Sequence, residues 1–227
     1  MEQRSAEFLK ALDDAKLTAL AEFAAGAGHE MNNPLAVISG RAQLLLRDET
    51  DESRRADLAL IKAQATRVHE MIADLMLFAR PPAPQKREVD LGPLIRDVAD
   101  KLRPAAEQRG GRIVLKLPDA PTMANVDPAQ IATVLRWLVE NGLNAAEAGV
   151  QVTIDLEGAT ITVRDNGPGI PEAERELIFD PYYSGRQAGR GLGMGLPKCW
   201  RFVRQHGGEL SVRAAGGGGT EFVIRLP

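Results

Sequence analysis

The sequence reads Gly28-His29-Glu30-Met31-Asn32-Asn33-Pro34-Leu35 within its N-terminal third, and this stretch decides how we interpret the rest of the chain. Apolar residues recur at steps of three and four on both sides of it, which predicts that His29 lies on an amphipathic helix. Pro34 has no N–H to donate to the carbonyl of Glu30, so we expect the helix to bend just after His29. Asn33 is four residues on from His29 and shares its face.

The residues around His29 suit a nucleophile. A neutral imidazole attacks through one ring nitrogen while a carboxylate holds the proton on the other, and the adjacent Glu30 could be that carboxylate. The small residues Gly26, Ala27 and Gly28 would let another chain or domain come close. The alternative is that His29 is a polar residue on a helix surface, and the second half of the chain favours the nucleophile.

Composition limits the classes of protein that the chain can belong to. The 227 residues allow one or two domains, and 44% hydrophobic with 26% charged residues is typical of a soluble globular protein. A net charge of −3 gives no general attraction to nucleic acid. The sequence has no apolar run long enough to span a bilayer and no signal peptide. Its one cysteine, Cys199, excludes an internal disulfide and fits a reducing compartment, so we expect a cytoplasmic protein.

The first third of the chain predicts a helical hairpin. A helix over 1–47 is broken by the polar run 47–53, and a second helix over 54–79 stops at the prolines in 81–84. A hairpin alone cannot cover both of its apolar stripes, so we expect a homodimer in which two hairpins form a four-helix bundle. The alternative is that the hairpin packs on the C-terminal domain of its own chain.

The remaining chain mixes strands and helices, which predicts a two-layer α+β sandwich. Asp127-Pro128 is typical of a helix start, with a capping residue followed by proline in the first turn. Residues 157–159 are the expected turn of a hairpin. Helices are predicted over 91–102, 128–148 and 194–205, and strands over 112–117, 123–126, 151–156, 160–164, 209–213 and 220–226.

Two motifs in this second region suit a nucleotide and its metal ion. Glu140-Asn141-Gly142-Leu143-Asn144-Ala145 lies on a predicted helix, from which an Asn carbonyl can complete the oxygen shell of Mg²⁺. Asp165-Asn166-Gly167-Pro168-Gly169-Ile170 follows a strand, where a carboxylate can accept a hydrogen bond from the amine of adenine. A polar helix face and a plain β-turn would explain each motif taken singly.

Two further motifs follow in the chain, Phe179-Asp180-Pro181-Tyr182-Tyr183 and Gly189-Arg190-Gly191-Leu192-Gly193-Met194-Gly195-Leu196. Glycines before a helix N-terminus expose N–H groups to a phosphate, and the helix dipole adds to the attraction. Residues 184–188 would form a lid, with Arg186 and Arg190 available to a triphosphate. A glycine-rich loop alone is weak evidence, but all four motifs in this order are strong evidence.

With these motifs the chain resembles the transmitter core of two-component sensor histidine kinases over about residues 18–227. The resemblance implies a signalling-helix extension over 1–17, a dimerisation and phosphotransfer domain over 18–80, a linker over 81–88, and a Bergerat-fold ATP-binding domain over 89–227. The stretches that carry it match the H-box (29–35), N-box (Asn141), G1 box (165–169), F-box (179–183) and G2 box (189–195), and Gly217-Gly218-Gly219-Thr220 resembles the final glycine-rich box.

The resemblance also implies roles for individual residues. His29 would accept the phosphoryl group from ATP, Glu30 would assist as the base, and Asn33 would position water when a response regulator is dephosphorylated. Asn141 would bind Mg²⁺ and Asp165 would bind the adenine amine. The full set implied to hold ATP is Asn141, Asn144, Asp165, Gly167, Gly169, Tyr182, Arg186, Gly189, Gly191, Leu192, Gly193, Met194, Gly195 and Thr220.

The sequence also departs from the family pattern. Trp137 occupies the place of the first Asn of the N-box, while Leu192 and Met194 stand where Thr and Leu are usual. Two alternatives to a kinase that phosphorylates a response regulator therefore remain. One is a nucleotide-binding scaffold or response-regulator phosphatase, and the other is an ATPase that hydrolyses ATP without transfer, although Trp137 replaces the Glu that activates water in related ATPases.

Overall fold

The computed structural model describes residues 2–146, 148–183 and 193–227, and it describes the side chains in these ranges except those of 2–18, 20, 21, 24, 25, 27 and 29. The chain divides into two compact units, Met1–Pro82 and Ala83–Pro227. Within the described ranges, no helix combines the length and the apolar character needed to cross a membrane.

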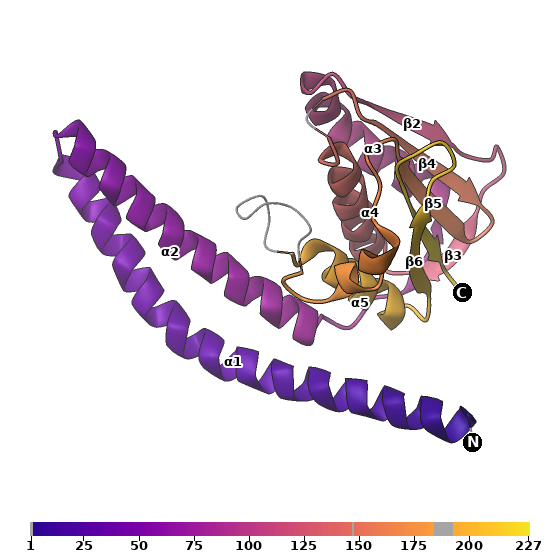
Figure 1. Cartoon of the computed structure of the whole chain (residues 1–227), viewed down its shortest axis with the longest axis horizontal. Coiled ribbons are helices and arrows are strands. Elements are labelled where there is room, and N and C mark those ends of the chain that lie inside the picture. Colours follow the sequence, from indigo (N-terminus) through magenta and orange to yellow (C-terminus); the bar gives the residue numbers. More distant parts are fainter. Residues whose placement is uncertain (1, 147, 184–192) are drawn as a thin grey trace. The chain divides into compact units, whose positions relative to one another are not determined.

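The first unit is a helical hairpin, as predicted. Helix α1 (Glu2–Asp48) and helix α2 (Glu52–Ala79) run side by side along the hairpin (Figure 1). The polar residues between them stop α1 and start α2, because the Asp51 carboxylate caps α2 by accepting a hydrogen bond from the Arg54 N–H at 2.9 Å. Arg55 closes the loop by donating to the carbonyls of Leu46 and Glu49 at 3.1 and 2.7 Å.

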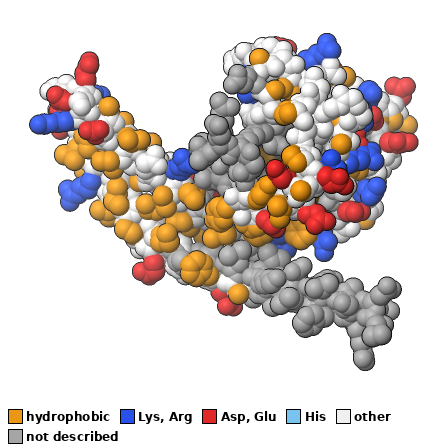
Figure 2. Space-filling view, in the orientation of Figure 1, with side chains coloured by type: hydrophobic (Ala, Val, Ile, Leu, Met, Phe, Trp, Pro, Cys, Tyr) orange, Lys and Arg blue, Asp and Glu red, His pale blue; other side chains and the backbone are white. Residues whose placement is uncertain are grey.

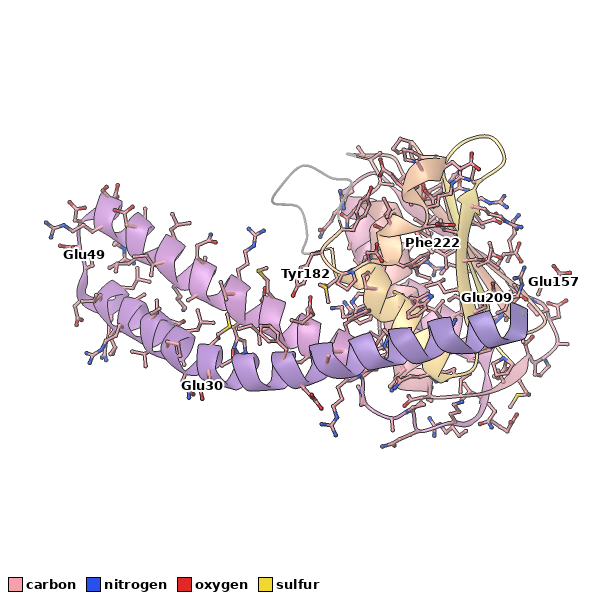
Figure 3. The ribbon with its side chains drawn as sticks, turned by 60° about the horizontal axis from the view of Figure 1, so that its bottom comes forward. Glu30, Glu49, Glu157, Tyr182, Glu209 and Phe222 are labelled. Atoms are coloured by element: carbon pink, nitrogen blue, oxygen red, sulfur yellow. The ribbon has the colours of Figure 1, made fainter. Side chains whose placement is uncertain are left out.

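Helix α1 continues through Pro34, and it changes direction near Glu30 (Figure 3). A proline inside a helix removes one hydrogen bond to the residue four positions earlier, which is Glu30 in this chain. The bend that the sequence predicted therefore lies in the turn after His29, where the backbone of Glu30 loses its partner.

The hairpin leaves much of its apolar surface uncovered. Few of its described side chains are buried, among them Ala42, Ala65, Ile72 and Phe78. Figure 2 shows hydrophobic side chains gathered along the hairpin. The large exposed ones are Phe23, Met31, Val37, Ile38, Leu44, Leu45, Leu60, Ile61 and Met76.

The second unit is a two-layer α/β sandwich, which confirms the predicted fold class. One layer is a five-stranded sheet of order β2-β4-β5-β7-β6, in which β2 and β4 are parallel and the other pairs are antiparallel. Its strands are β2 (Arg112–Lys116), β4 (Gln151–Glu157), β5 (Thr160–Asp165), β6 (Glu209–Ala214) and β7 (Thr220–Arg225).

The other layer is three helices that cover one face of this sheet (Figure 1), namely α3 (Leu91–Gln108), α4 (Pro128–Leu143) and α5 (Gly195–Gln205). The core lies between the layers, because alternate residues of β4 such as Ile154 face the helices and are fully buried. Helix α4 is central and packs against both α3 and α5. Its Leu135 and Leu138 have no exposed surface.

On strand β7, which lies between β5 and the edge strand β6, the charged residue Glu221 is buried. Its carboxylate accepts hydrogen bonds from Arg164 on β5 and Arg213 on β6, which compensate for its removal from water. Burial acts to raise the pKa of Glu221, but the two arginines outweigh it and hold that pKa below its usual value.

A second, two-stranded sheet contains an element that the residue pattern did not predict. Strand β1 (Arg87–Asp90) pairs antiparallel with β3 (Met123–Val126), so that Arg87 faces Val126 and Asp90 faces Met123. Four residues are too few to show alternation, and only the pairing with a distant strand reveals the element. Two short 3-10 helices lie next to the third nucleotide motif: η1 (Glu172–Glu174) precedes it, and η2 (Leu177–Phe179) ends at its first residue.

Two helix ends differ from the prediction. Helix α3 continues past residue 102 and through Pro104 to Gln108, because its buried side chains Leu102 and Ala106 keep packing on the sheet side. Helix α4 ends at Leu143 rather than near residue 148, and Asn144 is its C-cap. The side-chain oxygen of Asn144 accepts a hydrogen bond from Arg109, which ties the ends of α3 and α4 together.

Candidate active site

The predicted phosphoacceptor lies in the hairpin on α1, and two side chains near it, those of Glu30 and Asn33, are solvent-accessible. The backbone of His29 belongs to α1, whereas its side chain is outside the described part of the structure. Glu30 and Asn33 are both exposed. A partner domain or water can therefore reach the two residues that the sequence assigns to proton transfer and to water positioning.

A hydrogen bond joins the two helices next to this turn. The Nδ1 atom of His69 on α2 lies 2.8 Å from Oδ1 of Asn32 on α1. Because an amide oxygen only accepts, His69 donates from Nδ1. The sequence did not predict this contact, since it joins residues that are 37 positions apart.

Gly28 lets α2 approach the phosphoacceptor turn closely. It is buried, and a β-carbon at this position would lie 2.9 Å from Cγ2 of Ile72 and 3.3 Å from Sδ of Met76. Gly26, two residues earlier, has open space where a β-carbon would be. Gly28 therefore fixes how close the helices lie beside His29, while Gly26 does not.

The second cluster of predicted residues surrounds Asp165, at the end of β5. Asp165 is only 4% exposed, and its Oδ1 accepts hydrogen bonds from the N–H groups of Gly167 at 2.8 Å and Thr220 at 3.2 Å. These two donors fix the orientation of the carboxylate. Thr220 thus belongs to the site through its backbone. A buried, oriented carboxylate of this kind is suited to accept a hydrogen bond from an amine.

Glycines allow the backbone to close around Asp165. A β-carbon on Gly142 of α4 would lie 3.3 Å from that of Asp165, and one on Gly167 would lie 2.7 Å from that of Ala145. Gly169 has a φ of +84° and would place a β-carbon 3.1 Å from the carbonyl oxygen of Gly219. The end of α4 and the two glycine-rich turns therefore meet at one place.

The two N-box asparagines have different surroundings. Asn141 is half-buried on α4 and directly precedes Gly142, so the fold brings it to the same end of the unit as Asp165. Asn144 is exposed, and its side-chain oxygen is engaged by Arg109. Asn141 thus remains our candidate ligand for a cation, whereas a nucleotide would have to compete with Arg109 for Asn144.

The third and fourth motifs interlock. Tyr182 is exposed and has a φ of +65°, a left-handed conformation that a bulky residue rarely adopts (Figure 3). Gly193 has a φ of +66°, and a β-carbon there would lie 2.5 Å from the carbonyl oxygen of Tyr183. A residue other than glycine at position 193 would displace the 182–183 backbone.

Helix α5 begins immediately after this contact. Met194 is its N-cap and is 1% exposed, while Gly195 has open space around it. Among the residues that the structure describes, no side chain caps this first turn. Its N–H groups are therefore suited to an anion such as phosphate. The other predicted residues of the loop, Arg186, Gly189, Gly191 and Leu192, lie outside the described residues.

Trp137, which the sequence marked as a departure, has close contacts with α5. Its ring stacks on Phe202 with the centroids 5.8 Å apart, and the ammonium of Lys198 lies 4.5 Å from its centroid. Lys198 is only 6% exposed. Sequence reasoning missed Lys198, and the one available signal was a lysine in the first turn of a helix, where the helix dipole disfavours a cation.

The start of α4 is held by a buried polar network. Asp127 caps α4 by accepting from the N–H groups of Ala129 and Gln130, and it also accepts from Gln85 at 2.8 Å. Burial acts to raise the pKa of Asp127, but these three N–H groups outweigh it and lower the pKa. The N–H of Asp127 in turn donates to Nε2 of the buried His206 at 3.0 Å. The network fixes the helix that carries Trp137 and Asn141.

Taken together, the residues present fit Mg·ATP. The Asp165 carboxylate offers an acceptor for the adenine amine, the open first turn of α5 offers N–H groups for phosphate, and Asn141 offers an oxygen of the type that Mg²⁺ binds. A bound Mg²⁺ would neutralise charge that develops on the phosphate oxygens. The second unit thus carries three groups that complement Mg·ATP, and two of them, Asp165 and Asn141, lie at the same end of the unit.

Two family models match the chain. The "His Kinase A (phospho-acceptor) domain" matches residues 19–84, and the "Histidine kinase-, DNA gyrase B-, and HSP90-like ATPase" matches residues 126–227. The first match contains His29, and the second contains Asn141, Asp165 and Thr220.

Relatives match nearly the full chain. The C4-dicarboxylate transport sensor protein DctB of Pseudomonas aeruginosa is 32% identical over 99% of this chain and 39% of its own length. Sporulation kinase C of Bacillus subtilis is 31% identical over 96% of this chain and 51% of its own length. The crystal structure of full-length ShkA in complex with AMPPNP has 25% identity and a TM-score of 0.72, covering 91% of this chain and 45% of ShkA. The chain thus spans about half or less of each relative.

Proposed function

This chain belongs to the sensor histidine kinases, and from that premise we propose that it uses ATP to phosphorylate His29 and then passes the phosphoryl group to an aspartate of a response regulator. The observation that carries the proposal is the combination on one chain of the exposed side chains of Glu30 and Asn33 beside His29 and the buried, oriented Asp165 carboxylate. Neither alone specifies a phosphotransferase.

The residues of the second unit bind and orient the nucleotide. Asp165 accepts a hydrogen bond from the adenine amine, and the first turn of α5 donates N–H groups to the phosphates. Asn141 supplies an oxygen to Mg²⁺. These contacts position the γ-phosphorus, which is the main requirement of phosphoryl transfer because the protein contributes little covalent chemistry.

His29 is the nucleophile of the first step. A ring nitrogen of His29 forms a bond to the γ-phosphorus of ATP while the bond from that phosphorus to the β–γ bridging oxygen breaks, and ADP leaves. Glu30 holds the proton on the other ring nitrogen, which keeps the attacking nitrogen unprotonated. The exposure of Glu30 supports this step, since the ATP-binding unit has to reach this face.

The second step uses the same face. A carboxylate oxygen of the receiver domain of a response regulator attacks the phosphorus on His29, and the phosphorus–nitrogen bond breaks. In the opposing reaction, the dephosphorylation of the response regulator, Asn33 positions the water that hydrolyses the phosphoaspartate. The exposed Asn33 side chain supports this role.

We extend the proposal to a homodimer in the cytoplasm. The exposed apolar side chains of the hairpin, including Phe23 at 67% and Val37 at 63%, are a large cost for a monomer in water. Pairing two hairpins into a four-helix bundle buries them. The reaction needs ATP, which places these domains in the cytoplasm.

The deciding experiment is incubation with Mg²⁺ and γ-labelled ATP. The native chain, His29→Ala and the control His69→Ala are compared, because His69 lies on the same hairpin and hydrogen bonds to Asn32. We expect acid-labile label on the native chain and on His69→Ala, and none on His29→Ala.

Two outcomes would contradict the kinase. Label on His29→Ala would show that a residue other than His29 accepts the phosphoryl group. Bound nucleotide without label would favour the scaffold or phosphatase that Trp137 suggested, and free phosphate without labelled protein would favour an ATPase.

A further inference from the structure

A polar pair lies beside the apolar contacts between the two helices of the hairpin. On α2, Ile72 and Met76 pack against Gly28 of α1, where a β-carbon would lie 2.9 Å from Cγ2 of Ile72. His69 precedes Ile72 by about one helical turn, and its Nδ1 lies 2.8 Å from Oδ1 of Asn32. Asn32 in turn follows Gly28 by one turn of α1. The hydrogen bond therefore belongs to the same face of α1 as the apolar contacts.

These two contacts bracket the turn of the phosphoacceptor. The backbone of His29 lies between Gly28 and Asn32. Glu30 is two positions from each of them, about 200° around the helix, so it points away from α2, and it is exposed. Asn33 is about 100° on from Asn32 and is exposed as well. The rotation of this turn about the helix axis therefore sets where Glu30 and Asn33 point.

The turn has a weakened restraint of its own. Pro34 removes the hydrogen bond that the carbonyl of Glu30 would accept within α1. Apolar packing against Gly28 is non-directional. A hydrogen bond, in contrast, weakens steeply when its angle departs from linear. The contact from His69 to Asn32 thus supplies a directional restraint on the rotation of this turn.

We propose that His69 is a positioning residue for phosphoryl transfer, because its hydrogen bond to Asn32 fixes the rotation of the turn that carries His29, Glu30 and Asn33. The inference rests on the proposed function and deepens it. His69 acts through Asn32 and takes no part in making or breaking bonds. Its replacement leaves His29 in place, so label still forms on the chain, but more slowly.

The test compares His69→Leu with His69→Asn, two side chains of nearly the same shape. The Asn amide nitrogen stands where Nδ1 of His69 stands and can donate, whereas Leu has only methyl groups there. Initial rates of labelling are measured with Mg²⁺ over a range of γ-labelled ATP concentrations. We expect His69→Leu to lower kcat roughly two- to tenfold and to leave the KM for ATP unchanged, because ATP binds the second unit. His69→Asn should recover most of the native kcat, and the control Gln64→Ala, exposed on the same helix, should match the native chain.

Thermal unfolding separates this role from a structural one. Leu at position 69 adds apolar surface next to Ile72, so the thermal midpoint of His69→Leu should equal or exceed the native value. A fall in both the midpoint and kcat of His69→Leu would reduce His69 to a structural role. Native kcat in His69→Leu, or equal kcat in the Leu and Asn variants, would refute the proposal.

A double-mutant cycle tests whether His69 acts through Asn32. Asn32→Ala removes the acceptor, so it should also lower kcat. Adding His69→Leu to Asn32→Ala should then cause no further fall, because the contact is already lost. Falls in kcat that add in the double variant would contradict the proposed route.

Two further measurements need no phosphotransfer. In ¹⁵N NMR spectra of the imidazoles, at about pH 8, the proton of His69 should reside on Nδ1 in the native chain and shift to Nε2 in Asn32→Ala. His69→Asn assigns the signal among the three histidines. Backbone amides of 29–33 should exchange faster in His69→Leu than in His69→Asn, because the turn is less restrained.

These measurements distinguish the two proposals from each other. An unlabelled native chain would refute the proposed function, while the tautomer and the amide exchange would still show whether His69 holds this turn. A native His69 with its proton on Nε2, or equal exchange in the two variants, would overturn the inference even if His29 is labelled.

Discussion

Replacing Asp165 by Asn tests the adenine contact without disturbing the local fold. Oδ1 of Asp165 accepts the N–H groups of Gly167 at 2.8 Å and Thr220 at 3.2 Å, and an Asn carbonyl can accept both. The Asn amino group then takes the place of the other carboxylate oxygen. It would face the adenine amine, donor against donor, within a site where Asp165 is 4% exposed.

The expected loss follows from these contacts. Losing a hydrogen bond to a charged group costs about 1.5–3 kcal/mol, and leaving a buried donor unpaired costs about 1–3 kcal/mol. We therefore expect Asp165→Asn to bind ADP at least about a hundredfold more weakly than the native chain. Because both backbone hydrogen bonds persist, its thermal midpoint should stay close to the native value.

The assay is calorimetric titration with ADP and with inosine diphosphate, whose base carries an oxygen where adenine has its amine. The matched control is Asp155→Asn, a half-buried carboxylate on the neighbouring strand β4. An Asn amino group can donate to the inosine oxygen, so the preference for ADP over inosine diphosphate should fall sharply in Asp165→Asn and not in the control. ADP binding within threefold of native, or an equal loss for both ligands, would refute the reasoning.

Three other predictions concern stability and reactivity. Gly28→Ala should lower the free energy of unfolding of the hairpin by about 1–3 kcal/mol, because the added β-carbon would overlap Ile72. The control Gly26→Ala should not lower it, because a β-carbon there meets open space. Equal thermal midpoints for the two variants would contradict this prediction. Glu221→Gln should cost about 1–3 kcal/mol at pH 7 in urea unfolding. The pKa of Glu221 is lowered in the fold, so its contribution is present above the unfolded-state pKa and lost as the pH falls through the folded-state pKa, and the difference between variant and native should shrink towards pH 3. Burial raises the pKa of the Cys199 thiol, so a thiol reagent should modify it only in denaturant, and rapid modification of the folded chain would contradict its burial.

Much of the fold followed from local patterns. The spacing of apolar residues at steps of three and four, around His29 and again over 54–79, predicted the two helices of the hairpin. Asp127-Pro128 predicted the start of α4, where the structure shows the capping bonds to Ala129 and Gln130. Alternation in β4 and β5 predicted a strand pair with a tight turn, and only Gly158 and Ala159 separate the strands. These features were readable because each depends on residues a few positions apart.

The site was predictable in part, for the same reason. Asp165 and Asn141 were found because they stand in short motifs, and the fold brings their elements together through Gly142. What the sequence by itself determined was therefore which local structures form and which side chains carry chemistry.

Only the tertiary structure decided the contacts between distant segments. The pairing of β1 with β3, the hydrogen bond from Thr220 to Asp165 and the seating of Lys198 on Trp137 each join residues more than 30 positions apart. No local pattern records such a contact, because its free energy comes from burial and geometry that exist only after the chain has folded. From the sequence, Trp137 was only a tryptophan in the place of the first Asn of the N-box. The fold showed that the ammonium of the buried Lys198 lies over its ring.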